Sequence, residues 1–456
     1  MKKISYGISK MYLLLLILFT LIVFSSCKKF LDAKTNKQLV IPSSLDDAQA
    51  LLDFYDLMNG FYPSLGNESD DNFYLLPSYF NSLIVKQRNH HTWAKEALDE
   101  FDWDYMYQIV LNANIAIETV DKQPVEISNS TRARSIKGEA LFFRAFAFYQ
   151  VAQYYARPYD RSIASTVPGI PLRLSSALEP ESKRATLEET WQQIVKDFKS
   201  SIALVPLINT PLSRPSKAAA YAALARTYLD MGEFELSDKY VDSSLQLNHT
   251  LMDFNSLDTS LPYPFVRFNQ EVLFPCITQL TGMHLQTNYR VDSLLYQSYD
   301  TNDLRRKLYF VTNGPGTVGF RGSYDGTRSL FNGLATDETY LIKAECETRL
   351  GFKDSAMADL NKLLSTRWVT GTFVPFSAAT ADQALNIILA ERRKELILRG
   401  SRWFDLRRLN KDPRFAKTLI RIQNGITYTL PPMDPRYTFL LPVQVIALTG
   451  MLQNSR

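Results

Sequence analysis

Apolar residues recur every three to four positions along several stretches of the chain, which is the spacing of helices that bury one face. Ser44 precedes the first such stretch and Asp47 follows three residues later, a pattern that predicts an N-terminal cap. The same spacing indicates helices from Trp103 onward, over 132–155, and after a second capping residue, Thr186. The pattern therefore predicts a mostly helical fold.

Two stretches carry the alternation of small and large residues found in tetratricopeptide repeats, where small side chains let two antiparallel helices approach closely. The first lies within 215–248, turns at Gly232, and has Ser at two positions where Ala is usual. A weaker copy runs over 344–363. The copies start 119 residues apart, counted from Ala225 to Ala344, whereas consecutive repeats are about 34 residues apart. We therefore expect a tetratricopeptide-repeat-like scaffold of helix pairs with long insertions.

Two long stretches lack helical spacing. Residues 60–93 combine Gly, Pro and Asn with many aromatic residues, and we expect them to form an ordered loop. Residues 255–335 form the largest insertion and contain short β-prone segments such as 272–274. Loops of this length are usually either functional or disordered. The aromatic content favours order.

The N-terminus has the pattern of a lipoprotein leader. Lysines precede an uncharged run over 11–24, and two small residues then precede Cys27. We expect a signal peptide over 1–26, a lipidated Cys27, a polar tether over 27–42 and a single domain over 43–456. An ordinary signal peptide with a chance cysteine is the alternative. No other stretch of the sequence is apolar enough to span a bilayer.

Charge and composition exclude several classes of protein. The chain has 51 Lys and Arg against 47 Asp and Glu, a net charge of +4, which is too small for an electrostatic nucleic-acid binder. Four His leave little material for a histidine-rich metal centre. Beyond Cys27 the chain has Cys276 and Cys346, which we expect to be buried thiols, although pairing stays open.

Motifs for catalysis or cofactor binding are weak. Residues 314–319 match the glycine spacing of a dinucleotide site, but the following residues cannot start the helix that this site needs. Asp70 and Asp71 would suit a glycosidase acid pair or, with Asn72, a Ca²⁺ site, and neither reading has further support. We therefore expect a protein that is not an enzyme and needs no cofactor.

The densest pattern lies over 391–409, where acidic and basic residues alternate with Leu, Trp and Phe. On a continuous helix Glu395 would pair with Arg399, and Arg402 with Asp405. A functional reading would make this segment an anion site. We favour a charge-paired structural helix.

This segment resembles the C-terminal signature of the SusD/RagB family, the nutrient-binding lipoproteins of Bacteroidota outer membranes. Arg399 stands where many members carry Glu, so the chain resembles a divergent member. Further stretches resemble the family in the same order along the chain: 27–32, 138–145, 169–172, 184–186, 439–442 and 453–454.

The resemblance implies a lipid-anchored protein on the outer face of the outer membrane that covers a TonB-dependent β-barrel transporter of the SusC/RagA kind. Such proteins capture oligosaccharides, or peptides in some branches, and deliver them to the barrel. A peptide-binding member and a structural lid without its own ligand remain alternatives.

Aromatic residues in the two loop regions are the candidates for ligand binding, because sugars stack their C–H faces on aromatic rings and bind polar groups through their hydroxyls. Trp93 is the tryptophan that lies in neither a predicted helix nor the C-terminal signature. The predicted ligand-binding residues are Trp93, Tyr74, Tyr79, Arg88, Tyr263, Tyr289 and Tyr324.

Overall fold

The computed structural model describes residues 42–179 and 181–456. The predicted leader over 1–26, Cys27 and nearly all of the predicted tether over 27–42 lie outside the described residues. Those predictions therefore stay predictions. Residues 44–456 form one unit.

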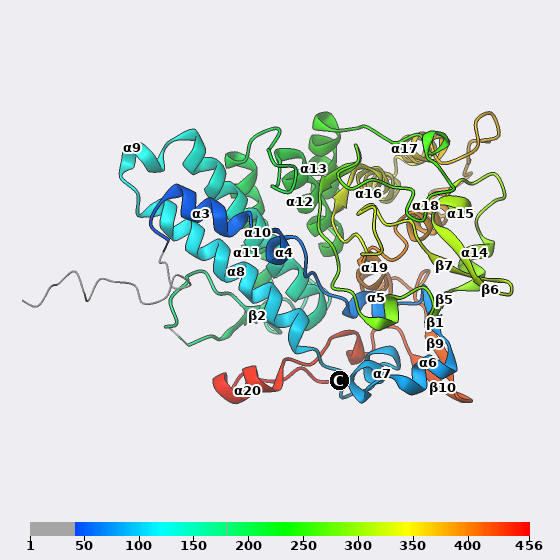
Figure 1. The fold of residues 1–456 in the computed structure, drawn as a ribbon, viewed down its shortest axis with the longest axis horizontal. Coiled ribbons are helices and arrows are strands. Elements are labelled where there is room, and N and C mark those ends of the chain that lie inside the picture. The colour runs from blue at the N-terminus through cyan, green and yellow to red at the C-terminus, as the bar shows by residue number, and fades with distance from the viewer. Residues whose placement is uncertain (1–41, 180) are drawn as a thin grey trace, which may run out of the picture. The chain divides into compact units, whose positions relative to one another are not determined.

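Long helices form the frame of this unit, and neighbours in the chain pack against each other (Figure 1). They are α8 (Glu100–Asp121), α10 (Thr131–Tyr155), α11 (Leu187–Leu204), α12 (Lys217–Met231), α13 (Phe234–Leu247), α16 (Thr336–Arg349), α17 (Lys353–Ser365) and α18 (Ala381–Glu395). The shorter helices are α3 (Leu45–Leu52), α4 (Tyr55–Met58), α5 (Leu65–Ser69), α6 (Pro77–Ser82), α7 (Val85–His91), α9 (Val125–Ser128), α14 (Ser293–Gln297), α15 (Arg305–Leu308), α19 (Ser401–Leu409) and α20 (Val443–Thr449). The predicted helical fold is confirmed.

Both predicted N-terminal caps are present. The Ser44 hydroxyl accepts a hydrogen bond from the backbone N–H of Asp47 at 3.1 Å, and the Asp47 carboxylate accepts one from the Ser44 N–H at 3.0 Å. Thr186 and Glu189 make the same reciprocal pair at the start of α11. These bonds satisfy N–H groups that a helix leaves unpaired in its first turn.

The repeat-like helix pairs form as predicted. Gly232 ends α12 in a left-handed conformation with φ +79° and lets the chain turn back into α13. The two Ser residues that replace Ala lie on α13 and donate hydrogen bonds to carbonyls of α12, Ser237 to Ala225 and Ser244 to Ala218, each at 2.9 Å. Serine therefore keeps the small size that close packing needs and adds a bond between the helices.

The second pair lies beside the first despite the insertion between them. Helix α16 packs against α13 as well as against α17, and α12, α13, α16 and α17 lie together in Figure 1. The insertion therefore leaves the helical frame and returns to it without separating the two pairs.

The expectation of a loop over 60–93 is wrong in detail. This stretch contains the short helices α5, α6 and α7 and the strand β1 (Phe73–Leu75). The helices have five to seven residues, so they are too short to display a helical period in their apolar positions.

The insertion over 255–335 is ordered and has its own hydrophobic core, which includes many of its aromatic rings. Its strands pair in small antiparallel sheets, β1 with β5, β4 with β8, and β6 with β7. The strands of the unit beyond β1 are β2 (Pro168–Pro171), β3 (Arg184–Thr186), β4 (Val272–Phe274), β5 (Tyr289–Val291), β6 (Phe310–Gly314), β7 (Thr317–Phe320), β8 (Leu334–Ala335), β9 (Leu419–Gln423) and β10 (Ile426–Leu430).

The glycine motif over 314–319 forms the turn of the β6–β7 hairpin. No helix follows it, because residues 321–333 are turns, bends and irregular backbone. The segment therefore lacks the helix N-terminus that would hold the pyrophosphate of a dinucleotide.

The segment over 391–409 is a buried charge-paired structure, as predicted, but it is not one continuous helix. Helix α18 ends at Glu395 and α19 begins at Ser401. Between them Leu398 and Gly400 have positive φ, and a Cβ on Gly400 would lie 2.7 Å from the Asn332 Oδ1. Close approach of Asn332 thus requires glycine at this break.

The break also changes the ion pairs. Glu395 does not pair with Arg399; its carboxylate bonds the guanidinium groups of Arg305 and Arg367 at 2.9 and 2.8 Å. Arg402 does not pair with Asp405 but with Asp71, at 2.7 Å. The Glu395–Arg399 prediction was wrong because it assumed helical spacing across Gly400. Arg402 and Asp405 do share α19, but each has a nearer partner, since Asp405 bonds Arg392 and Arg408.

The two remaining cysteines are buried and free. Burial raises the pKa of the Cys346 thiol to about 12 and that of Cys276 well above its usual value. Both behave as small apolar groups of the core, as predicted for buried thiols.

Candidate functional site

Three of the predicted aromatic residues are buried and offer no surface to a ligand. Trp93, Tyr289 and Tyr324 are each 1% exposed. The Trp93 indole N–H donates to the Ser69 carbonyl at 2.8 Å, and the Arg421 guanidinium lies 4.5 Å from the ring centroid. Trp93 therefore has no open ring face for stacking, although it borders the same depression as Tyr74, and its role in ligand binding stays a prediction.

The two tyrosines hold the core of the insertion together. The Tyr289 hydroxyl accepts a hydrogen bond from the Phe320 N–H at 3.0 Å, and the Tyr324 hydroxyl donates to Glu271 at 2.9 Å. Burial raises the pKa values of Tyr289 and Tyr324 well above the usual value for tyrosine. An insertion of this length needs large aromatic side chains to fill its own core, and Tyr289 and Tyr324 pack in that core.

The other four candidates are accessible. Tyr74, on β1, is 39% exposed, and Tyr79, Arg88 and Tyr263 are partly buried. The Tyr79 hydroxyl lies against Gly282, whose added Cβ would come within 2.3 Å of it. No contact joins Arg88, on α7, to the other candidates. The structure thus brings Tyr79 to the loop 281–288, which also borders Tyr263.

Tyr263 lines a hollow in the insertion of about 260 Å³, which we call the insertion hollow. The hollow is bordered by the loop after Thr281 and by the segment that follows β7, and contains no carboxylate among its lining residues. Its lining residues are Tyr263, His284, Leu285, Gln286, Thr287, Phe320, Arg321, Ser323, Thr327, Arg328 and Leu330.

Two buried donors in the insertion hollow have no hydrogen-bond partner among the described residues. They are the Nε2 of His284 and the Nε of Arg321. The His284 Nδ1 lies 3.3 Å from the Thr281 hydroxyl and accepts from the Thr281 N–H at 3.5 Å, which leaves the proton on Nε2. Burial lowers the pKa of His284, so the ring is neutral and offers one N–H.

The Arg321 guanidinium is held by backbone carbonyls and not by a carboxylate. Its Nη atoms donate to the carbonyls of Leu261, Thr259 and Lys307, at 2.8, 2.8 and 2.6 Å, and desolvation lowers its pKa. Those three bonds fix the guanidinium, and its buried Nε–H is left without a partner among the described residues. Sequence reasoning missed His284 and Arg321, because each is an isolated residue in a loop and only the folded insertion brings them to Tyr263.

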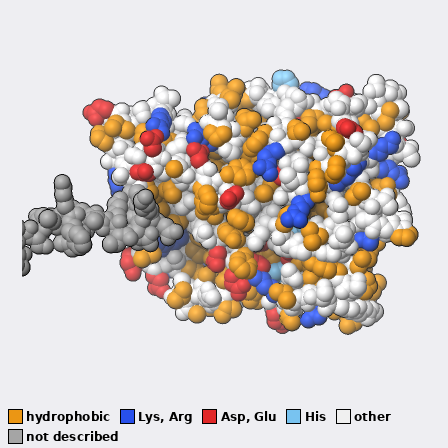
Figure 2. Space-filling view, viewed as in Figure 1, with side chains coloured by type: hydrophobic (Ala, Val, Ile, Leu, Met, Phe, Trp, Pro, Cys, Tyr) orange, Lys and Arg blue, Asp and Glu red, His pale blue; other side chains and the backbone are white. Residues whose placement is uncertain are grey.

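Lys and Arg side chains also gather over the insertion half of the face in Figure 2, whereas Asp and Glu are more frequent over the half formed by α3, α8 and α9. The exposed surface around the insertion therefore favours ligands rich in acceptor oxygens over cationic ones.

Tyr74 lines a second depression of about 470 Å³ beside β9. Asp71 also lines it, and bonds Arg402 and Lys417, each at 2.7 Å. Although burial disfavours the charge, Arg402 and Arg393 hold the pKa of Asp71 well below its usual range. The carboxylate is fully engaged and leaves no free acid or base in this depression.

Asp70 and Asp71 do not form a catalytic pair in this arrangement. Asp70 is fully buried, and its two oxygens accept hydrogen bonds from the backbone and side-chain nitrogens of Asn72 at 2.8 and 2.9 Å. Retaining and inverting glycosidases need two carboxyl groups that face one substrate. Across residues 42–179 and 181–456, no three His, Cys, Asp or Glu side chains gather in a metal-binding cluster.

Comparisons with known proteins agree with this architecture. The sequence profile of a family described as "Starch-binding associating with outer membrane" matches residues 29–229, and the profile of the SusD family matches residues 336–443. The chain belongs to the SusD/RagB family. The family is a carbohydrate-binding one associated with the outer membrane.

Relatives of this family member are distant in sequence. The SusD-like protein P38 of Formosa agariphila is 22% identical, over 74% of this chain and 77% of that protein. A SusD superfamily protein of Bacteroides thetaiotaomicron has the same fold, with a TM-score of 0.75, 20% identity, and coverage of 91% of this chain and 100% of that one.

One structural neighbour carries a ligand in its name. It is a laminarin-binding SusD-like protein, with a TM-score of 0.65, 17% identity, and coverage of 90% of this chain and 98% of that one. These likenesses establish the SusD fold. Among the described residues, no helix has the length and apolar character needed to cross a membrane.

Proposed function

We propose that this protein captures oligosaccharides at the cell surface, in the insertion hollow, and delivers them to a TonB-dependent transporter in the outer membrane. The observation that carries the proposal is the pair of unpartnered buried donors, His284 Nε2 and Arg321 Nε, beside the accessible ring of Tyr263. Buried donors without partners are costly unless a ligand satisfies them.

The chemistry of the insertion hollow suits a sugar. The ring of Tyr263 offers a face for sugar C–H groups, and the two N–H groups can donate to hydroxyl or ring oxygens. A volume of about 260 Å³ lies at the small end for ligand pockets. The hollow therefore accommodates a short part of an oligosaccharide, while the remainder lies on the surface around it.

The fold and family support the rest of the proposal. The carbohydrate-binding description of the family and the laminarin-binding neighbour favour a glycan over a peptide. A lipid on Cys27 would hold the protein at the outer membrane, next to the transporter. In this proposal the protein binds and passes on its ligand without catalysis, which the engagement of Asp70 and Asp71 within the fold supports.

Isothermal calorimetry with a panel of oligosaccharides and short peptides tests the proposal. We expect saturable heat with one class of sugar. Tyr263→Ala should weaken that binding roughly tenfold, since aromatic contacts contribute on the order of 1 kcal/mol. Tyr221→Ala is the matched control, because Tyr221 is a partly buried tyrosine on α12 that does not line the hollow.

Other results would contradict the proposal in different ways. Heat with peptides alone would place the protein in the peptide-binding branch of the family. No binding heat with either panel would favour a protein that covers the transporter and has no ligand of its own. Equal losses in Tyr263→Ala and Tyr221→Ala would place the sugar outside the insertion hollow.

A further inference from the structure

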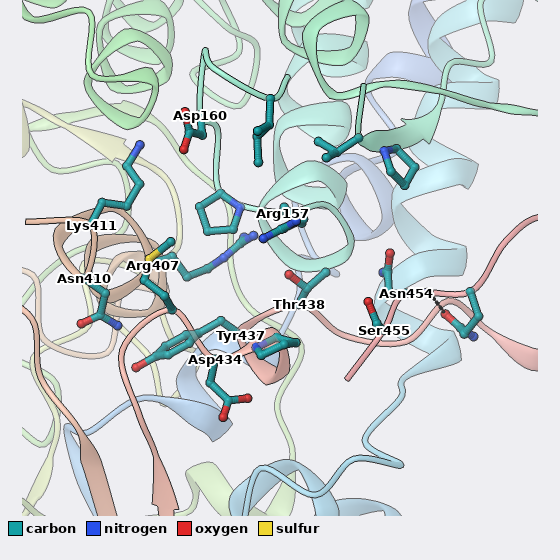
Figure 3. A pocket seen from close by; sticks show the side chains of 17 residues that line it. Arg157, Asp160, Arg407, Asn410, Lys411, Asp434, Tyr437, Thr438, Asn454 and Ser455 are labelled. Carbon is teal, nitrogen blue, oxygen red and sulfur yellow. Dashed lines mark hydrogen bonds between the residues drawn. The ribbon is translucent and has the colours of Figure 1, made fainter. Parts of the chain in front are cut away.

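A second hollow lies away from the insertion, between the loop that follows α10, the end of α19 and the C-terminal segment. We call it the C-terminal hollow (Figure 3). Its volume is about 300 Å³, and it shares no lining residue with the insertion hollow. The groups that define it are Arg157, Asp160, Arg407, Asn410, Lys411 and Tyr437.

Arg407 is a buried cation without a carboxylate partner. The residue is 2% exposed. Its guanidinium donates to the side-chain oxygen of Gln153 at 3.3 Å and to the Ala156 carbonyl, and its Nε has no partner among the described residues. Burial lowers the pKa of Arg407 to about 10. The next residue, Arg408, is also buried but bonds both Glu345 and Asp405.

The acidic group whose charge acts most on Arg407 is Asp230, but the two side chains form no ion pair. Asp230 accepts hydrogen bonds from the Tyr149 hydroxyl at 2.7 Å and from Gln153 at 2.6 Å, and lies 3.7 Å from Arg408. Asp230 is thus already satisfied. The charge of Arg407 faces the hollow unpaired, which is an unfavourable arrangement for a buried ion.

Two further cations border the same space. Figure 3 shows the guanidinium groups of Arg157 and Arg407 turned toward each other across the hollow. Arg157 is exposed and has no ion pair with any described residue. Lys411 donates to the Tyr159 carbonyl at 2.6 Å, and burial lowers its pKa. Like charges that face each other repel unless an anion lies between them.

Two carboxylates lie at the rim, and the charge of one of them, Asp160, acts on Lys411 and Arg157 nearby. Asp434 bonds Arg436 through two contacts of 2.8 Å, and Asp160 accepts from the hydroxyl and N–H of Ser162 at 2.6 and 3.0 Å. Neither carboxylate pairs with Arg407. Positive charge therefore dominates the floor of the hollow.

From this geometry we infer that the C-terminal hollow binds an acidic sugar, with its carboxylate between Arg157 and Arg407. The volume exceeds what a bare inorganic ion fills. The buried side chains of Asn410 and Tyr437 add polar groups that suit sugar hydroxyls, although the Asn410 Oδ1 already accepts from the Lys417 N–H at 3.0 Å. A free uronic acid and the end of an acidic glycan share this chemistry. The inference does not rest on the function of the insertion hollow.

Saturation-transfer NMR with the purified full-length protein in detergent tests this inference with glucuronate, glucose and sulfate as probes. We expect saturable transfer to glucuronate and none to glucose, which lacks the carboxylate. Arg157→Gln should weaken glucuronate binding about tenfold, because bonds between charged groups are the strong ones. Arg157 is exposed, so this variant should fold normally.

Arg161→Gln is the control, because Arg161 is a neighbouring exposed arginine that bonds Glu233 and does not line the C-terminal hollow. It should leave glucuronate binding unchanged. Equal transfer to glucose and glucuronate, binding of sulfate without glucuronate, or equal losses in the two arginine variants would each overturn the inference.

Discussion

The fold strongly raises the pKa of one buried carboxyl group, that of Asp70. Its side chain is fully buried, and burial raises its pKa to about 7, with the neighbouring charge of Asp71 adding to the effect. The unfolded chain would release the proton near pH 4. The folded state therefore retains a proton that the unfolded state loses, and the protein becomes less stable as the pH rises from about 4 to 7.

We predict that Asp70→Asn stabilises the protein above pH 7 and flattens the dependence of stability on pH between 4 and 7. The difference of about three between the two pKa values sets an upper bound of about 4 kcal/mol on the gain at pH 8. Urea unfolding of both proteins at pH 4 and pH 8 measures it. A gain of the same size at both pH values would mean that the charge of Asp70 is not the cause.

The buried pair of His90 and Glu68 also depends on both charges. The two side chains lie 2.8 Å apart and are each 2% exposed. The pair holds the pKa of Glu68 below and that of His90 above the usual value, although burial opposes both shifts. Its stabilisation is lost as the pH falls through the pKa of Glu68 or rises through that of His90.

We predict that His90→Ala costs about 3–5 kcal/mol at pH 6, because it leaves a buried carboxylate unpaired. The cost should shrink at acid pH, where Glu68 becomes protonated. Urea unfolding at pH 6 and pH 4 gives both values. His249→Ala, on an exposed loop residue, serves as the control. A cost independent of pH would indicate lost packing rather than a lost ion pair.

At the scale of elements, the break between α18 and α19 is held by Arg305 of the insertion and by Arg367, which follows α17. Glu395 lies between Arg305 and Arg367, and all three side chains are fully buried. Arg367 also bonds Glu271 at 2.9 Å, next to β4. The C-terminal signature thus connects the helical frame to the insertion that carries the candidate site.

We predict that Glu395→Gln destabilises the protein by about 3–5 kcal/mol, because it removes the charge shared by two buried guanidinium groups. Denaturant unfolding measures the loss. Asp382→Asn is the matched control on the same helix, since Asp382 forms a solvent-exposed pair with Arg414, and such pairs contribute little. Similar losses in both variants would contradict a special role for the buried network.

Local sequence patterns predicted the elements that local forces decide. The caps at Ser44 and Thr186 and the helix pair around Gly232 follow from neighbouring residues, and they are present. The partners of Glu395 could not be predicted, because Arg305 and Arg367 are 90 and 28 residues away. The short helices over 60–93 lacked a period that a pattern could reveal.

For the whole molecule, the sequence indicated the regions of the site but not its residues. Composition shows that a loop is rich in aromatic residues. Only the packing of the folded chain decides which of those side chains are buried. Trp93 is covered by Arg421, which lies 328 positions later in the chain. His284 and Arg321 become informative only once folding leaves their N–H groups buried without partners.

A crystal structure of the protein with the oligosaccharide that binds in calorimetry would show whether the insertion hollow holds a sugar. We expect a sugar ring on Tyr263, with oxygens within hydrogen-bond distance of His284 Nε2 and Arg321 Nε. A sugar bound elsewhere, with both nitrogens still unpartnered, would contradict it.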